Sequence, residues 1–278
     1  MKVSEYLEVF RVLSYPELFS NECLDALKSI QDKYGELDSS RVLYEIVLDK
    51  PVFTADFSRR LYDEILKYYW LEFDFANLAP CVFLEALSMA ESFPIDEERK
   101  MHKFFGREKF ERVKQPLTDL TKLLKSRNTT LLNLGKLDCR GEQYFDSVRV
   151  ETRVKTGRRV IEILMALSYT GDLSLVESTL SEFEPYALRN LFTVAFELFP
   201  DRISDKIGVY FSPLSQLKYL RDFMNLLVEK GFCLPEKAET VIDWRRDPIP
   251  DGLYMQNVNH LKFSFERNNL LSVKAYLT

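Results

Sequence analysis

Apolar and polar residues alternate along several stretches of the chain, which is the pattern of a β-strand with one apolar face. Between residues 41 and 49, the apolar side chains of Val42, Tyr44 and Ile46 share one face, and the opposite face carries charge. Turn-forming residues at 49–51 lead to a second alternating stretch at 52–58, so the two are predicted to form a hairpin. Alternation returns later in the chain, at residues 129–138, 145–154, 191–199, 205–211, 259–266 and 270–277.

Helical periodicity occupies the segments between these strand pairs. Between residues 58 and 70, the apolar residues from Leu61 to Tyr69 recur at helical spacing and would form one stripe. Ser58 is a suitable N-cap, so a helix is predicted there. Residues 79–92 fit either a strand or a helix. The other predicted helices are residues 97–126, 158–167, 173–183 and 215–230, the last of which ends before Gly231. The chain therefore cycles between pairs of strands and pairs of helices.

Three architectures fit these elements. The strands of an open, half-solvated sheet would alternate in the same way. In a mostly helical α+β domain, the alternation would not mark strands at all. The helices, however, occur between strand pairs throughout the chain, where they can cover the apolar face of one continuous antiparallel sheet. Closing that sheet removes its exposed edges and turns its polar face inward. We therefore predict a single α+β domain over residues 1–278, a closed barrel surrounded by helices.

The polar strand faces would line the interior of such a barrel. Its cations would be Arg41, Arg149, Arg153, Lys206, Lys262 and Lys274. The other inward polar groups would be Glu45, Asp56, Glu151, Glu197 and Tyr210. Enclosing so many charges is unfavourable unless they are paired or meet a charged ligand. A wide interior rich in cations is typical of a binding chamber for an anion.

Composition excludes several classes of function. The 278 residues carry 38 Lys and Arg against 43 Asp and Glu, a net charge of −5, so no overall positive field favours nucleic acid or an anionic membrane. The sequence contains no run of about 18 apolar residues, and its first residues do not resemble a signal peptide. We expect a cytoplasmic protein.

Common catalytic and metal-binding motifs are missing from the sequence. It contains no GxGxxG, GxxxxGK[ST], GxSxG, HExxH or DDxxD motif. The histidines are His102 and His260, and the separated cysteines are Cys23, Cys81, Cys139 and Cys233. Their spacing does not predict a zinc site, and we expect reduced thiols. We expect His260 to be a polar-face residue of a strand and Trp70 and Trp244 to be packing residues.

Four segments resemble, in order and spacing, motifs of the ABBA prenyltransferases, and most of all those of the cyanobactin-type peptide prenyltransferases. In the first, GKLDCRGEQYFDSVRVETRV (135–154), Arg149 follows Asp138 by eleven positions and takes the place of a diphosphate-binding lysine. The others are LMALSYTGD (164–172), LRNLFTVAFELFPDRISDKIGVYFSPL (188–214) and VNHLKFSFERNNLLSVKAYL (258–277). The resemblance covers residues 130–278 well and residues 36–70 loosely.

This resemblance implies the ABBA fold, a ββαα repeat whose barrel of about ten antiparallel strands holds an allylic diphosphate. It also implies transfer of a dimethylallyl or geranyl group, with Mg²⁺ at the diphosphate, to a side chain of a ribosomally made, cyclic or linear peptide. The chain departs from the family at three positions. Glu151 stands where the family has a histidine, and the family's proposed base corresponds to Asp38 or to Glu45. The arginine that follows this base in the family corresponds to Arg41, or it is missing and Ala55 or Asp56 stands in its place. Asp38, Glu45 and Glu151 are therefore the candidate catalytic residues.

The chemistry of prenyl transfer suggests further roles. The departing diphosphate needs positive charge, and the allylic cation needs aromatic faces and shelter from water. The candidate diphosphate ligands are Arg41, Arg149, Lys206 and Lys274, and the candidate shield of the cation is Tyr210 with Tyr276. Asp56 and Glu197 are candidates for binding the acceptor, and no metal ligand is predicted.

The inward acids favour a cationic acceptor, an arginine guanidine, with tyrosine or tryptophan as open alternatives. Two other functions stay open: an ABBA prenyltransferase acting on small aromatic molecules, and a non-catalytic barrel that binds a partner.

Overall fold

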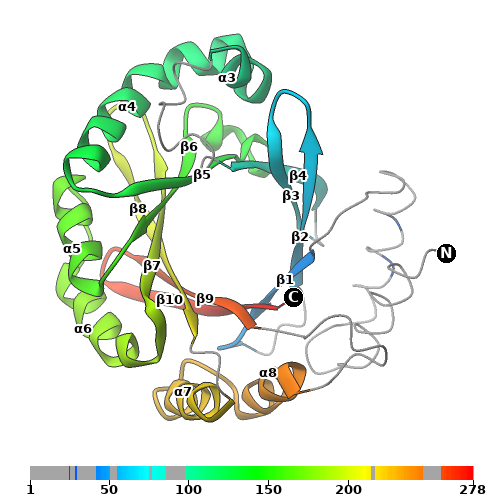
Figure 1. Cartoon of the computed structure of the whole chain (residues 1–278), viewed down its shortest axis with the longest axis vertical. Coiled ribbons are helices and arrows are strands. Elements are labelled where there is room, and N and C mark those ends of the chain that lie inside the picture. The colour runs from blue at the N-terminus through cyan, green and yellow to red at the C-terminus, as the bar shows by residue number, and fades with distance from the viewer. Residues whose placement is uncertain are drawn as a thin grey trace.

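Ten antiparallel strands close into a barrel, and helices pack around its outer surface (Figure 1). The structure, a computed structural model, describes residues 42–50, 55–74, 77–85, 98–213, 217–246 and 258–277, together with Asp25 and Ser29. Within these residues, no helix combines the length and the apolar character that crossing a membrane requires.

From residue 98 onward, pairs of helices alternate with pairs of strands, as the periodicity predicts, whereas the four strands between residues 42 and 85 follow one another with no described helix between them. The strands are β1 (Val42–Val47), β2 (Ala55–Asp63), β3 (Lys67–Asp74), β4 (Asn77–Glu85), β5 (Thr130–Lys136), β6 (Val148–Val154), β7 (Ala187–Leu198), β8 (Ile203–Pro213), β9 (Val258–Glu266) and β10 (Asn269–Leu277). The α-helices are α3 (Glu98–Phe105), α4 (Arg107–Ser126), α5 (Gly157–Ala166), α6 (Leu173–Phe183), α7 (Leu217–Glu229) and α8 (Pro235–Arg246). Short 3₁₀ turns are η3 (Asp138–Arg140), η4 (Glu142–Tyr144) and η5 (Glu184–Tyr186).

Pairing between β1 and β10 closes the barrel. Tyr44 lies opposite Leu277, and Glu45 lies opposite Tyr276. All other neighbours in the barrel are consecutive in the sequence, so the strand order is β1-β10-β9-β8-β7-β6-β5-β4-β3-β2. Every strand therefore has two hydrogen-bonded neighbours, and the barrel has no exposed edge.

Side-chain alternation separates an apolar outer face of the barrel from a polar inner face. On β6, Val148 and Val150 are fully buried between the barrel and the helices, whereas Glu151 lines the interior and Arg149 reaches inward to Tyr210. The predicted alternation on this strand is confirmed, and the outer face is covered by helices rather than by solvent.

Aromatic side chains fill the layer between the barrel and the helices. The ring of Phe183 on α6 lies 4.9 Å from that of Phe263 on β9 and 5.2 Å from that of Phe223 on α7, measured between ring centroids. Trp244 on α8 is fully buried and packs edge-on against Tyr44 on β1. Trp244 is therefore a packing residue, as expected. The sequence patterns did not predict α8.

The helix predicted at residues 58–70 is wrong, because this segment forms the hairpin of β2 and β3. Asp63 turns the chain: its Oδ1 accepts hydrogen bonds from the backbone N–H groups of Ile65 at 2.8 Å and Leu66 at 2.9 Å. Lys67 follows with a φ of 65°, in the left-handed region that continues no helix. The apolar residues that share a helical stripe in the sequence therefore lie on both sides of a tight turn. Residues 79–85 of the ambiguous segment belong to the strand β4, and the rest of that segment lies outside the described residues.

The expectation of reduced thiols is wrong for two cysteines. Cys81 on β4 and Cys139 in η3 form a disulfide across 58 residues of sequence. Cys233 is a buried free thiol, and Cys23 lies outside the described residues. The pair escaped prediction because its partners approach each other only when the chain after β5 folds back over the barrel, next to β4.

Candidate active site

The interior of the barrel holds a cavity of about 450 Å³, a size typical of small-molecule sites. Each of the ten strands contributes to its wall. The lining residues are Leu43, Ser58, Trp70, Glu72, Phe83, Glu85, Leu132, Asn133, Glu151, Arg153, Thr193, Tyr210, Phe211, Ser212, Asn259, His260 and Tyr276. Acids and aromatic rings dominate this wall, so the cavity suits a ligand that is partly apolar and partly cationic.

Three carboxylates face the cavity. Glu85 accepts a hydrogen bond from Nε1 of Trp70 at 2.7 Å, and Glu151 accepts one from Nδ2 of Asn133 at 2.7 Å. Glu72 is paired with Arg140 of η3. Burial raises the pKa of Glu72, and the charge of Arg140 only partly offsets this effect. The wall thus offers several acceptors for N–H groups and for a positive charge.

Three aromatic rings form one continuous surface of the cavity. The rings of His260 and Tyr276 stack at 4.0 Å between centroids, and Tyr210 lies 5.2 Å from the first and 5.9 Å from the second. Burial raises the pKa of both tyrosines above the usual value, so their hydroxyls are neutral near pH 7. The faces of such rings attract cations.

Three basic side chains lie beside these rings, and we call Arg149, Lys262 and Lys274 the cation group. Nζ of Lys262 lies 5.0 Å from the ring centroid of Tyr210, and Nη2 of Arg149 is 3.4 Å from the hydroxyl of Tyr210. Lys262 and Lys274 stand directly opposite each other on β9 and β10. Like charges in this position destabilise a sheet. The arrangement therefore favours a bound anion.

Two members of the cation group have carboxylate partners. Arg149 donates to Oε1 of Glu197 at 3.0 Å, and Lys274 pairs with Glu45. No described carboxylate forms an ion pair with Lys262. Burial and the charge of Arg149 lower the pKa of Lys262 to about 8. An anionic ligand would supply the missing countercharge and favour the protonated lysine.

Glu45 is held as an anion by its neighbours. Burial by itself would raise the pKa of this carboxyl, but the charges of Lys274 and Lys262 outweigh burial and hold it well below its usual range. Hydrogen bonds from Lys274 and from the hydroxyl of Tyr276 act in the same direction. A carboxylate with so low a pKa is a weak base, so Glu45 is better suited to orienting Lys274 and Tyr276 than to accepting a proton.

Two glycines leave room for the cation group. A Cβ at Gly208 would lie 2.8 Å from Cε of Lys262, and a Cβ at Gly135 would lie 2.8 Å from Cβ of Arg149 and 2.7 Å from the ring of Phe83. Distances this short do not occur between real atoms of these kinds. The absence of a Cβ at Gly208 and Gly135 therefore leaves the space that Lys262 and Arg149 occupy.

His260 contributes an aromatic face rather than a charge. Burial, with a further effect of the Lys262 charge, lowers the pKa of His260 to about 3, so the imidazole is neutral near pH 7. Its Nδ1 lies 2.7 Å from Oδ1 of Asn259. The position agrees with the expectation of a polar-face residue on a strand.

The structure brings most of the predicted site residues together. Those that converge inside the barrel are Glu45, Arg149, Glu151, Glu197, Tyr210, Lys274 and Tyr276. Lys206 has an exposed side chain, and Glu197 pairs with Arg149 instead of lining the cavity. Asp38 and Arg41 lie outside the described residues. The backbone of Asp56 pairs with that of Glu45, but its side chain is likewise outside the described part.

Other residues of the cavity wall were missed. Glu72, Phe83 and Glu85 received no role, and Trp70, expected to be a packing residue, lines the cavity. Because residues 58–70 were predicted to form a helix and residues 79–92 either a strand or a helix, the inner faces of β3 and β4 were not recognised. Lys262 was placed on the inner face but not selected as a ligand. Counting back from the turn between β9 and β10 places it opposite Val273, because the count does not include the register shift between Leu270 and Ser272 that brings it opposite Lys274.

The inner residues offer limited means to hold the expected Mg²⁺. This ion commonly takes one or two carboxylates and completes its shell with phosphate and water. Oε2 of Glu197 is buried, and no described group donates a hydrogen bond to it. Glu197, beside Arg149, therefore fits as one carboxylate ligand of an ion that also binds a diphosphate.

Comparison with solved structures identifies a similar fold. The crystal structure of 6-dimethylallyltryptophan synthase from Micromonospora olivasterospora, in complex with DMASPP and Trp, matches with a TM-score of 0.55 and 13% sequence identity, over 86% of this chain and 82% of that one. No protein-family model and no curated protein matches the sequence. The predicted α+β ABBA barrel is confirmed as the fold, whereas the cyanobactin-type assignment stays a prediction.

Proposed function

We propose that the protein transfers a prenyl group from an allylic diphosphate to an acceptor bound in the barrel. The observation that carries this proposal is the cation group, in which Lys262 opposes Lys274 beside Arg149, directly next to a wall of aromatic rings. An anionic leaving group and a carbocation are the two species that such an arrangement stabilises. The fold shared with a synthase solved in complex with DMASPP and Trp supports the same chemistry.

The cation group would bind the diphosphate and stabilise it as it leaves. The bond between the allylic carbon and the diphosphate oxygen breaks, and the oxygen keeps both electrons. Arg149 and Lys262 offer hydrogen bonds and positive charge to this oxygen in a water-poor interior, where charges interact more strongly than in bulk solvent. Mg²⁺, when bound beside Glu197, would add further positive charge.

The rings of Tyr210, Tyr276 and His260 would shield the allylic cation from water. The cation–π interaction with each ring face stabilises a cation by about 0.5–2 kcal/mol. The acceptor nucleophile forms a bond with the allylic carbon, and its proton goes to a carboxylate. Glu151 is our candidate for this base, because it lines the cavity and, of the described residues, only Asn133 donates a hydrogen bond to it.

The acceptor that fits this wall best is cationic. Glu72, Glu85 and Glu151 line the cavity, whereas the members of the cation group, on β6, β9 and β10, are not part of its lining. We therefore favour an arginine guanidine of a ribosomal peptide, cyclic or linear, held by these carboxylates. Glu197 is paired with Arg149, and Asp56, whose side chain lies outside the described residues, stays a predicted acceptor ligand. The cytoplasmic location stays a prediction.

A small aromatic acceptor is the second candidate. Trp70 and Phe83 give the cavity two further aromatic walls, and the similar synthase was solved with Trp bound. An indole N–H would find carboxylate acceptors in the same place.

Mass spectrometry of reaction products tests both candidates. The protein is incubated, with and without Mg²⁺, with dimethylallyl or geranyl diphosphate and with peptides that contain Arg, Tyr or Trp, or with free tryptophan. A mass gain of one or two isoprene units on the Arg peptide supports the guanidine acceptor. A gain only on free tryptophan supports the small-molecule candidate. No gain on any acceptor, from protein that binds the donor, contradicts prenyl transfer to these classes.

A further inference from the structure

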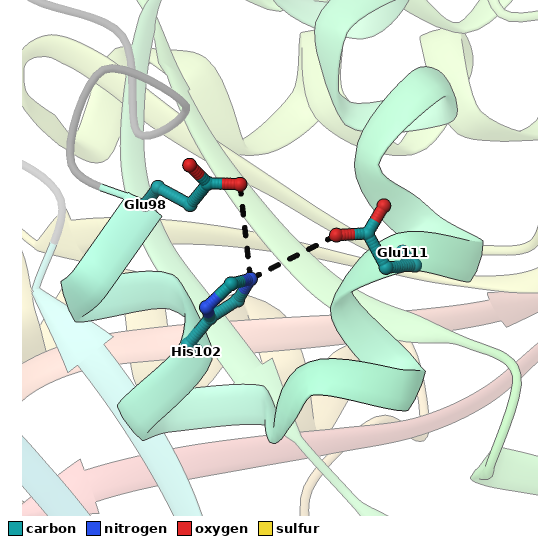
Figure 2. Close-up of side chains that lie close together, drawn as sticks. All are labelled: Glu98, His102 and Glu111. Carbon is teal, nitrogen blue, oxygen red and sulfur yellow. Dashed lines mark ion pairs between the residues drawn. The ribbon is translucent and has the colours of Figure 1, made fainter.

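A cluster of three metal-ligating side chains lies on helices outside the barrel wall (Figure 2). Glu98 and His102 are one turn apart on α3, and Glu111 belongs to α4. One ligand atom from each residue lies within 4.8 Å of the other two. None of the three lines the cavity, so the proposed prenyl transfer does not account for this cluster.

The imidazole of His102 points between the two carboxylates. Its Nε2 lies 3.8 Å from an oxygen of Glu98 and 3.8 Å from an oxygen of Glu111. These distances are too long for hydrogen bonds. Nε2 is itself buried and has no hydrogen-bond partner among the described residues. A buried nitrogen without a hydrogen-bond partner is unfavourable. Because Nε2 points between the two carboxylates, a ligand bound at that position would satisfy it.

The same distances suit a shared ion. Two ligands about 2.0–2.2 Å from a tetrahedral metal ion lie about 3.4 Å from each other. Nε2 is a few tenths of an ångström beyond this distance from each carboxylate oxygen, and the two carboxylates, whose oxygens lie within 4.8 Å of each other, would turn inward to reach the ion. The carboxylates are each 55% exposed, and their exposure gives an ion a path from solvent.

The backbone between the helices holds the ligands in this position. Gly106 joins α3 to α4 with a φ of 80°, a conformation that non-glycine residues rarely adopt. The resulting bend turns Glu111 toward His102. The ring of Phe110 packs edge-on against the imidazole at 5.2 Å and fixes its orientation.

The other charged residues near the cluster do not all favour metal binding. Lys114 lies 3.4 Å from the same oxygen of Glu98 and would compete with a metal ion for it. Glu108 is paired with Arg112 and not with the cluster. The alternative to a bound metal ion is a protonated His102 that forms ion pairs with both carboxylates. A zinc titration distinguishes the ion-pair cluster from a metal site.

We propose that Glu98, His102 and Glu111 bind a transition-metal ion of the zinc class. One imidazole nitrogen with two carboxylates suits borderline ions such as Zn²⁺, whereas Mg²⁺ and Ca²⁺ prefer sites made of oxygen alone. The ion would join α3 to α4. Because Lys103 of α3 pairs with Asp63 at the β2–β3 turn, it would also brace that turn of the barrel.

Zinc binding to the full-length, tag-free protein tests this proposal. After removal of metals with EDTA, the protein is titrated with ZnCl₂ by calorimetry, and Co²⁺ absorption reports the ligand geometry. We expect one Zn²⁺ per chain and a melting temperature raised by roughly 5 °C at saturation. His102→Gln should abolish binding, and Glu111→Gln should weaken it at least about tenfold.

Glu177→Gln is the matched control, because Glu177 is an exposed acid on α6, away from the cluster. It should bind zinc as the original chain does. Should His102→Gln fail to fold, the Glu98→Gln/Glu111→Gln double variant, which changes only exposed side chains, replaces it. Absence of zinc binding, or equal binding by the His102 or double variants, overturns the proposal and leaves an ion-pair cluster.

Discussion

Lys262 is the member of the cation group that forms no ion pair with a described carboxylate. Replacing it with methionine keeps the apolar stem and removes the charge that would face the diphosphate. We expect Lys262→Met to lower kcat for prenyl transfer by about 10²–10³-fold with an unchanged melting temperature. Steady-state kinetics checks this result. Lys218→Met, an exposed lysine on α7, is the control and should leave kcat unchanged. Equal activity of the two variants would show that Lys262 does not act on the donor.

The lowered pKa of Lys262 predicts a pH dependence of donor binding. The lysine is protonated below its pKa of about 8 and loses its charge above it. Affinity for dimethylallyl diphosphate should therefore be constant below pH 8 and fall by up to about tenfold per pH unit above it. Calorimetric titrations between pH 6.5 and pH 9.5 would measure this change. In Lys262→Arg the charge persists, so the decrease should vanish; an identical decrease in this variant would assign the titration to another group.

Gly208 tests whether space, and not only charge, positions the cation group. A Cβ at this position meets Cε of Lys262 at 2.8 Å, so Gly208→Ala should displace the lysine and weaken donor binding at least about tenfold. In a Lys262→Ala background the same change should have little effect, because the clashing atoms are gone. Additive losses in the double variant would mean that Gly208 acts on something other than Lys262.

At the scale of elements, the Cys81–Cys139 disulfide joins β4 to η3, and the neighbouring residue Arg140 reaches Glu72 in the cavity wall. Reduction should lower the free energy of unfolding by about 2–4 kcal/mol, since the bond closes a long loop of the unfolded chain. Thermal unfolding with and without dithiothreitol measures this effect. The Cys81→Ser/Cys139→Ser variant should melt at the lower temperature with and without dithiothreitol. If the melting temperature of the original chain is the same with and without dithiothreitol, the disulfide is contradicted.

Elements with a clean alternation were predictable, and those whose pattern is broken by a turn were not. On β6, β8 and β9, apolar residues alternate with polar ones and the face of each side chain followed directly. Residues 58–70 contain apolar residues at helical spacing, but Asp63 and Lys67 impose a turn that only the hydrogen bonds to the Asp63 carboxylate and the φ of Lys67 reveal. The misassigned segment carries part of the cavity wall, so the error at this level removed Ser58 and Trp70 from the predicted site.

At the scale of the whole molecule, closure of the barrel depends on the pairing of β1 with β10, the first and the last of the described strands. The sequence predicts closure because covering helices recur between strand pairs. It does not predict which charges pair inside, because those contacts depend on register across strands far apart in sequence. The ion pair of Glu45 with Lys274 is of this kind, and it turned a candidate base into an orienting residue.

The central claim is that the cation group binds an allylic diphosphate inside the barrel. Calorimetric titration with DMASPP, the ligand present in the similar synthase, tests it most directly, using the original chain and the Arg149→Gln/Lys262→Met double variant. We predict one bound molecule per chain in the original protein and no measurable binding in a double variant that keeps its melting temperature. Absence of binding to the original chain, or equal binding by the folded double variant, would contradict the claim.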